Sequence, residues 1–141
     1  ANAYVSQMVK HGKTESSKEV ILTKGEQPVP TISDEKLDFL ISREFPNDKE
    51  LVIIKLSKIK SDSENGKNRI STSILKLANK KLDKIDTLIK RANEDFRDIV
   101  SEAEYPRAHK SGFELFDKEE KIIRNVLLAD WEEYSTWTEK K

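Results

Sequence analysis

Three carboxylates near the middle of the chain have the type and the spacing to hold a cation. Asp95, Asp98 and Glu102 are spaced i, i+3 and i+7, which places them on one face of a helix. Carboxylate oxygens are the ligands that hard cations such as Mg²⁺ prefer. The same spacing also describes the solvated face of an ordinary amphipathic helix. Two interpretations therefore stay open: a site for cation binding or cation-dependent catalysis, and a plain polar surface.

Other catalytic groups are scarce. The sequence has no cysteine and only two histidines, His11 and His109, which lie far apart. Disulfides, zinc–thiolate sites and thiol catalysis are therefore excluded, and a histidine metal site would lack converging ligands. No G-x-S-x-G motif offers a strained nucleophile. We expect no cofactor, and we favour a protein that is not an enzyme.

The last predicted helix carries a carboxylate among apolar side chains. On a helical wheel, Asp130 falls near the middle of the apolar arc. Because an unpaired buried charge costs several kcal/mol, this carboxylate needs a partner. The planar guanidinium of an arginine can donate hydrogen bonds to both carboxylate oxygens at once. We therefore predict that Asp130 pairs with an arginine, with Arg97 as the first candidate and Arg107 as the second.

Asp130 can be interpreted in two ways. In one, it forms a buried ion pair that fixes the last helix on the helix before it. In the other, it is a polar spot in a binding groove lined by Trp131, Tyr134 and Trp137. Aromatic side chains of this kind anchor many interfaces, and they also fill many cores. The sequence leaves both interpretations open.

The elements that would position these residues are helices. N-cap residues recur from Ser33 onward, and apolar residues then follow at a period near 3.6, with Pro46 and Pro106 as stops. We predict six helices, over residues 33–45, 47–60, 67–78, 81–92, 95–105 and 117–137, with residues 107–116 as a loop. The expected fold is mainly α: a compact bundle of five or six helices arranged as a stack of helix hairpins.

The N-terminal segment has a different composition. Residues 1–32 hold two glycines, two prolines and only scattered apolar residues. We predict that they form an extended or disordered arm, in which residues 4–9 and 20–23 could form short strands. Residues 33–141 would then form a single helical domain.

Charge is balanced over the chain but not along it. Lys and Arg number 26 and Asp and Glu also number 26, whereas residues 49–91 hold twelve basic and five acidic residues and residues 93–141 hold eight and thirteen. The zero net charge disfavours a nucleic-acid partner. The longest apolar runs are too short to span a membrane, and we expect a cytoplasmic protein. The two charged halves either pack against each other or dock a charged protein partner.

Four segments carry a resemblance. They read ILKLA at 74–78, DFRDIV at 95–100, AEYPR at 103–107 and DWxxYxxW at 130–137. The pattern resembles that of a group of small bacterial helical proteins, over residues 33–137. The resemblance implies a bacterial source and a small helical fold, and it implies no activity. It also links the DFRD segment to the last helix, as an Arg97–Asp130 pair would.

These observations favour a non-catalytic protein-interaction module, of the kind used as immunity proteins, antitoxins and adaptors. The charge split and the aromatic last helix support a protein partner, and the oligomeric state stays open. The alternative is a cation-dependent enzyme or metal-binding protein that uses Asp95, Asp98 and Glu102.

Overall fold

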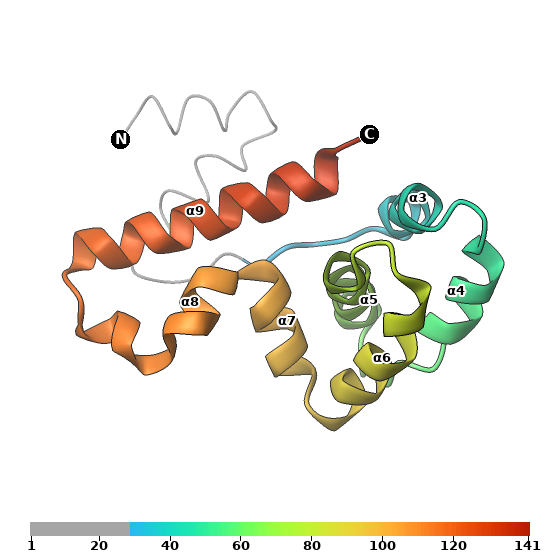
Figure 1. Ribbon diagram of the computed structural model, residues 1–141, viewed down its shortest axis with the longest axis horizontal. Helices are drawn as coiled ribbons and strands as arrows, with labels where there is room; N and C mark the ends of the chain where they lie inside the picture. The colour runs from blue at the N-terminus through green and yellow to red at the C-terminus, as the bar shows by residue number, and fades with distance from the viewer. Residues whose placement is uncertain (1–28) are drawn as a thin grey trace.

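The computed structural model describes residues 29–141, and these residues are helical almost throughout (Figure 1). They are 78% helical and contain no strand, which confirms the prediction of a compact, mainly α fold. Residues 1–28 lie outside the described residues, and with them the two short strands predicted at 4–9 and 20–23. Within the described part of the chain, no helix is both long enough and apolar enough to cross a membrane.

The described helices follow one another with short connections. In chain order they are α3 (Asp34–Glu44), α4 (Lys49–Leu56), α5 (Glu64–Ala78), η1 (Leu82–Lys84), α6 (Ile85–Glu94), α7 (Phe96–Glu104), α8 (Pro106–Ser111), η2 (Gly112–Asp117) and α9 (Glu120–Glu139), where η marks a 3₁₀ helix.

Local cap residues set several helix starts. The side chain of Ser33 accepts a hydrogen bond from the backbone N–H of Lys36 at the start of α3, and Asp95 does the same for Arg97 at the start of α7. Ser33 is the first N-cap that the sequence predicts, and Asp95 is the first residue of the helix predicted over 95–105. The last helix begins later than predicted, because Glu119 rather than Asp117 is its N-cap residue.

Helix α5 is the centre of the bundle, with α3, α6 and α7 packed around it (Figure 1). Its apolar residues Ile70, Ile74 and Leu75 lie in the main core. Its polar side chains are buried as well. The hydroxyls of Thr72 and Ser73 donate to backbone carbonyls one turn earlier in the same helix, so they are satisfied without a partner elsewhere.

Residues 29–32 belong to the helical body rather than to a separate arm. Pro30 and Ile32 are buried. The backbone N–H of Ile32 donates to Asn65 Oδ1 at 3.1 Å, and its carbonyl accepts from Asn68 Nδ2 at 3.0 Å. Both asparagines lie on α5, so this short extended segment is fastened to the central helix.

The segment predicted as a loop at 107–116 is helical, and that prediction is wrong. Pro106 stops α7, but it also occupies the first turn of α8, where its fixed φ suits a helix and its missing N–H costs nothing. Gly112, with φ +59°, then turns the chain from α8 into η2.

Helix α9 lies along α8 and α7, and its C-terminal end approaches α3 (Figure 1). The guanidinium of Arg43 on α3 donates to the backbone carbonyls of Trp137 and Lys140, at 2.7 and 2.6 Å. It also lies 4.6 Å from the centre of the Trp137 ring, in a cation–π contact. Arg43 therefore closes the end of α9 against the bundle.

Candidate functional site

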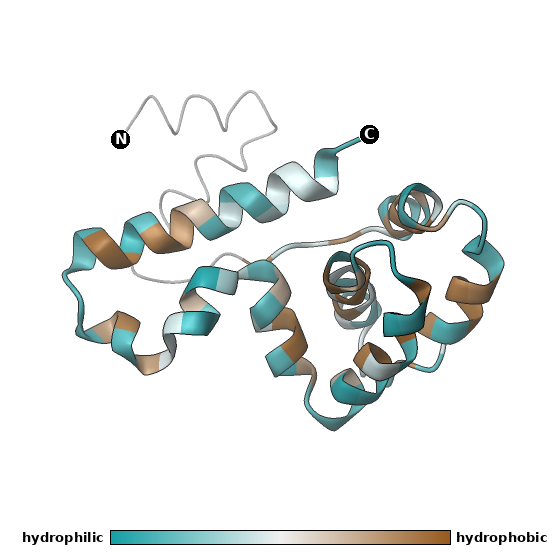
Figure 2. Ribbon diagram, in the orientation of Figure 1, coloured by the Kyte–Doolittle hydropathy of each residue, from teal (hydrophilic) through white to brown (hydrophobic). Residues whose placement is uncertain are grey.

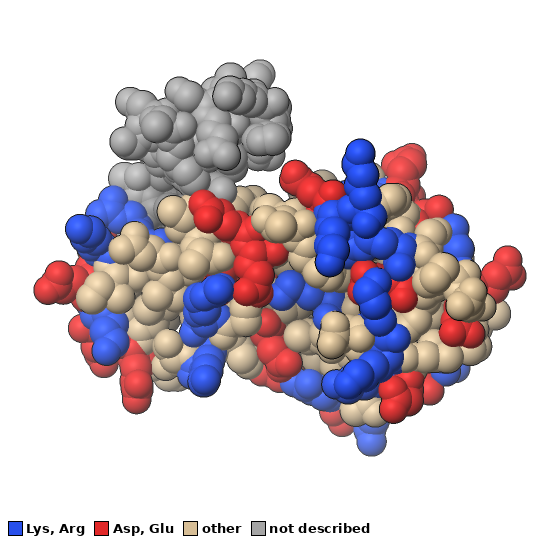
Figure 3. Space-filling view, turned by 45° about the horizontal axis from the view of Figure 1, so that its top comes forward, with Lys and Arg blue, Asp and Glu red and all other residues tan. Residues whose placement is uncertain are grey.

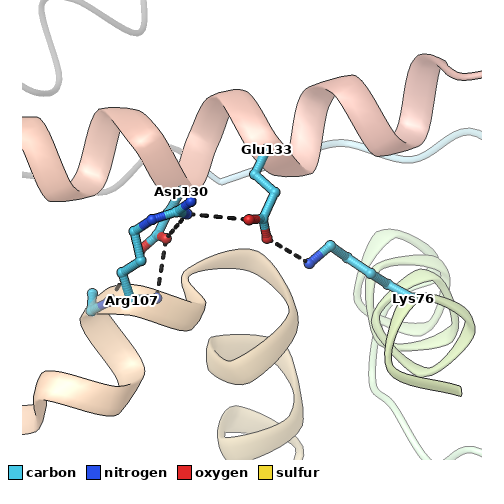
Figure 4. Close-up of polar contacts among 5 residues, drawn as sticks. Lys76, Arg107, Asp130 and Glu133 are labelled. Carbon is cyan, nitrogen blue, oxygen red and sulfur yellow. Dashed lines mark hydrogen bonds and ion pairs between the residues drawn. The ribbon is translucent and has the colours of Figure 1, made fainter. Parts of the chain in front are cut away.

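Asp130 is fully buried and has three hydrogen-bond donors (Figure 4). Its Oδ1 accepts from the backbone N–H of Arg107 at 3.1 Å and from the Arg107 guanidinium at 2.8 Å. Its Oδ2 accepts from the backbone N–H of Ala108, also at 3.1 Å. The carboxylate predicted to need an arginine therefore has one, and both of its oxygens are satisfied.

The two backbone contacts make Asp130 the N-terminal cap of α8. Tyr105, the residue at the N-cap position, supplies no side-chain hydrogen bond to that helix. The first N–H groups of a helix need an acceptor, and a carboxylate there also interacts favourably with the helix dipole. Asp130 supplies this acceptor from α9, which fixes α9 and α8 together.

Arg97 does not reach Asp130, so the first-named partner was wrong. Its side chain is 81% exposed and its Nε pairs with Asp95 Oδ1 at 3.2 Å. Ile99 and Val100 turn their face of α7 into the core, which leaves Arg97 facing solvent. Arg107, the second candidate, is the partner because it lies on α8, the helix that Asp130 caps.

The Asp130–Arg107 pair continues into a short network (Figure 4). The Arg107 guanidinium also lies 3.3 Å from Glu133 Oε1, and the other oxygen of Glu133 accepts from Lys76 Nζ at 3.2 Å. Hydrogen bonding to Asp130 and the nearby charge of Glu133 raise the pKa of Arg107. The network joins α8 and α9 to α5.

A second buried carboxylate, Glu104, forms an ion pair that the sequence did not predict. Arg69 on α5 donates to its two oxygens from Nε and Nη2, at 2.7 and 2.8 Å. Glu104 is 2% exposed. Burial raises its pKa, and the hydrogen bonds from Arg69 act in the opposite direction. One feature of the sequence could have indicated the burial of Glu104: it directly follows Ala103, at the edge of the apolar face of α7.

The aromatic residues of α9 do not line one groove. Tyr134 is buried, and its hydroxyl has no hydrogen-bond partner among the described residues. Trp137 packs on the main core. Trp131 packs in a smaller cluster with Tyr105 and Leu127. The structure therefore uses these side chains to hold α9 on two separate parts of the bundle.

The three carboxylates considered for a cation are bound to arginines instead. Arg91 Nη2 lies 2.9 Å from Asp98 and 3.2 Å from Glu102. Asp95 caps α7 and pairs with Arg97. Within residues 29–141 no group of three acidic or histidine side chains is arranged to hold a metal ion.

The basic and acidic halves of the chain are joined to each other by several of these pairs. Arg69–Glu104, Lys76–Glu133 and Arg91–Asp98 each connect residues 49–91 with residues 93–141. On the face shown in Figure 3, a group of Asp and Glu side chains lies beside a band of Lys and Arg side chains. Part of the uneven charge along the chain therefore serves packing between its halves.

Two exposed phenylalanines lie on η2, the 3₁₀ helix that follows α8. Phe113 is 90% exposed and Phe116 is 67% exposed. They border a hollow of about 280 Å³, whose other lining residues are Ser101, Ala108, His109, Gly112 and Leu115. We call Phe113, Phe116 and this hollow the η2 surface. This surface was not among the predicted sites, although two phenylalanines in a stretch predicted as a loop were a signal.

A second exposed apolar surface lies on α4. Leu51, Ile53 and Ile54 are 43%, 42% and 60% exposed, whereas Val52 and Leu56 are buried. Figure 2 shows α4 as one of the most hydrophobic helices of the fold, although it lies at the edge of the bundle. We call Leu51, Ile53 and Ile54 the α4 face. The run of four apolar residues at 51–54 was its signal in the sequence.

Comparison with known proteins adds no relative. No protein-family model matches the chain, and neither the curated proteins nor the solved structures give a significant match. Within this chain, residues 103–107 supply Glu104 and Arg107, and residues 130–137 supply Asp130 and Tyr134, so these two segments meet between α7, α8 and α9.

Proposed function

We propose that the protein is a non-catalytic protein-interaction module, of the immunity, antitoxin or adaptor type, and that it binds its partner through the η2 surface. The observation that carries the proposal is the exposure of Phe113 and Phe116 beside an open hollow. Clustered exposed aromatic side chains are uncommon on a monomer's surface, and they are typical anchors of protein interfaces.

The ionisable side chains support a binding role over a catalytic one. The two most deeply buried carboxylates, Asp130 and Glu104, are bound by arginines and backbone N–H groups. Asp98 and Glu102 share Arg91. Each of these groups already has a structural partner, so none of them is poised for acid–base work.

A photo-crosslinking experiment tests the proposal. A photoreactive amino acid is placed at position 113 of the full chain, in cells that express it naturally, and at Thr136 as a matched exposed control on α9. We expect position 113, and not position 136, to form an adduct with one defined protein. That protein should bind the purified chain in calorimetry and should lose binding to the Phe113→Ser/Phe116→Ser variant.

The opposite outcome is equally clear. If position 113 yields no more adduct than position 136, or if the captured protein binds the double serine variant as well as the unchanged chain, the η2 surface is not the binding site and the proposal is wrong.

A further inference from the structure

We infer that the chain self-associates head to tail, with the α4 face of one copy docked on the η2 surface of the next. The inference goes beyond the proposed function, because it names a second copy of this chain, rather than a different protein, as an occupant of the η2 surface. It is carried by three properties of the two surfaces: their apolar character, their charges and their positions in the fold.

The α4 face is apolar where a surface helix should be polar. An amphipathic surface helix turns one apolar stripe inward and keeps polar residues outside, whereas a helix that is apolar all round is normally covered on all sides. Helix α4 buries Val52 and Leu56 inward and still presents Leu51, Ile53 and Ile54 outward. Three of its eight residues are charged, and the three outward apolar residues give the helix a surface that a further layer could cover.

The η2 surface has room for such side chains. Its hollow of about 280 Å³ is lined by apolar groups, including Ala108, Leu115 and the two exposed phenylalanines. A cavity of about 150 Å³ already accommodates a benzene ring. An isoleucine such as Ile54 could therefore enter the hollow while Phe113 covers the neighbouring turn of α4.

The charges beside the two surfaces are opposite. Residues 49–60 hold four lysines and one glutamate, and residues 112–120 hold four acidic residues and one lysine. Lys49 and Lys55 pair with Asp38 and Asp86, but Lys58 and Lys60 form no ion pair with a described residue. The four acidic residues on the other side are equally without ion pairs in the described part of the chain: Glu114, Asp117, Glu119 and Glu120. Glu50 and Lys118 are also without ion pairs among the described residues, so the balance of unpaired charge is basic beside the α4 face and acidic beside the η2 surface. Opposite balances favour this docking and oppose α4 on α4.

The positions of the two surfaces determine the kind of assembly. Figure 1, drawn with the longest axis horizontal, has α4 near one end of the molecule and the turn between α8 and α9 near the other. Contact between two different surfaces at opposite ends is heterologous, so each copy keeps one surface free after the first contact. The assembly therefore grows as an open chain unless it closes into a ring.

A mixing experiment with single-surface variants tests this directly. Ile54→Glu blocks the α4 face and Phe113→Glu blocks the η2 surface, and both sites are exposed, so the fold should persist. We expect sedimentation velocity to show concentration-dependent oligomers for the unchanged chain and for Thr136→Glu, the matched control on α9. Each single variant should stay monomeric alone. An equimolar mixture of the two should form a discrete dimer, because each variant retains the surface that the other lacks.

Three results would overturn the inference: a monomeric unchanged chain at every concentration, oligomers that survive in both single variants, or a mixture that contains monomers only. Charge-reversal variants provide an independent test of the same contact. Lys58→Glu/Lys60→Glu should weaken binding to the unchanged η2 surface, and Glu114→Lys/Asp117→Lys on the other copy should restore it. Failure of that restoration would contradict the assigned contact.

The two proposals fail separately. If the unchanged chain is monomeric but position 113 still captures another protein, self-association is wrong and the proposed function stands. If the adduct at position 113 is a second copy of this chain, and the mixture forms the dimer, the self-association is confirmed and the immunity, antitoxin or adaptor role loses its support.

Discussion

Arg69 on α5 and Glu104 at the end of α7 face each other, and both of their hydrogen bonds are shorter than 3 Å, at 2.7 and 2.8 Å. Arg69 comes from the basic part of the chain and Glu104 from the acidic part, and the pair links α5 to the end of α7. The charges of both residues act on the pKa of Tyr134, which lies on α9. This pair is therefore one of the points at which three helices meet.

The pair predicts a pH dependence of stability. Burial raises the pKa of Glu104 above its ordinary value of 4.5, so the folded state holds this proton more tightly than the unfolded state. The stability that Glu104 contributes is then fully present below pH 4.5 and is lost as the pH rises through the folded-state pKa. Glu104→Gln removes the titration. Urea unfolding across acidic to neutral pH should show the unchanged chain losing stability relative to this variant as the pH rises.

Glu94→Gln, at an exposed position on α6, is the matched control for the loss of one negative charge. The opposite trend in the Glu104→Gln series, a growing advantage of the unchanged chain at higher pH, would mean that the bond to Arg69 outweighs burial.

Tyr134 supplies a second prediction. Its hydroxyl is buried and has no hydrogen-bond partner among the described residues, and burial with the charge of Glu104 raises its pKa. Tyr134→Phe removes an unsatisfied group and keeps the ring, so the free energy of unfolding should stay equal or rise by up to about 1 kcal/mol. Tyr134→Ala should instead cost about 3–5 kcal/mol through lost packing. A substantial loss with phenylalanine would show that the hydroxyl has a partner.

The turn after α5 supplies a third prediction. Asn79 and Lys80 have φ values of +51° and +65°, in the left-handed region that favours glycine. Lys80→Gly should raise the free energy of unfolding by about 1 kcal/mol. The lost contact between the exposed Lys80 ammonium and Glu44 should subtract little, because Arg43 still pairs with the buried Glu44. Lys81, with φ −103°, is the matched control. Lys81→Gly should lower stability by about 0.5–1 kcal/mol. If thermal unfolding shows equal changes in stability for Lys80→Gly and Lys81→Gly, the left-handed backbone at Lys80 is not strained.

The Arg107 side chain should matter less than its backbone. The Arg107 side chain is 48% exposed, so Arg107→Ala should lower the free energy of unfolding by about 1 kcal/mol or less. The backbone N–H groups of Arg107 and Ala108 still reach Asp130 in this variant. In a double-mutant cycle with Asp130→Ala, the two changes together should cost less than their sum, because both remove the same contact. Strictly additive costs in urea unfolding would show that the pair contributes nothing.

Local signals in the sequence predicted much of the helical fold. Ser33 and Asp95 are caps in the structure because capping depends on residues within one turn. The burial of Asp130 was also readable, because helical periodicity alone places it among apolar side chains. The sequence could not show which of Arg97 and Arg107 is the partner of Asp130. That choice depends on which helix α9 packs against, and that is a property of tertiary structure.

The errors have equally specific causes. Pro106 was read as the end of a helix, although the same residue also starts one. The exposure of Phe113 and Ile54 was not predicted, because apolar side chains such as those of the run at 51–54 are normally buried. The burial of Glu104 was missed because glutamate is rarely buried without a partner, and its partner Arg69 lies 35 residues away.

Asp130 holds the fold together, whereas Phe113 and Phe116 form a surface that the fold does not need. The free energy of unfolding in urea, measured for one variant of each kind, tests this contrast most directly. Asp130→Ala leaves two backbone N–H groups of α8 and a guanidinium without their acceptor, and should cost about 3 kcal/mol. Phe113→Ser/Phe116→Ser changes exposed side chains only, and should stay within about 0.5 kcal/mol of the unchanged chain. An Asp130→Ala variant as stable as the unchanged chain, or a large loss in the phenylalanine variant, would contradict the claim.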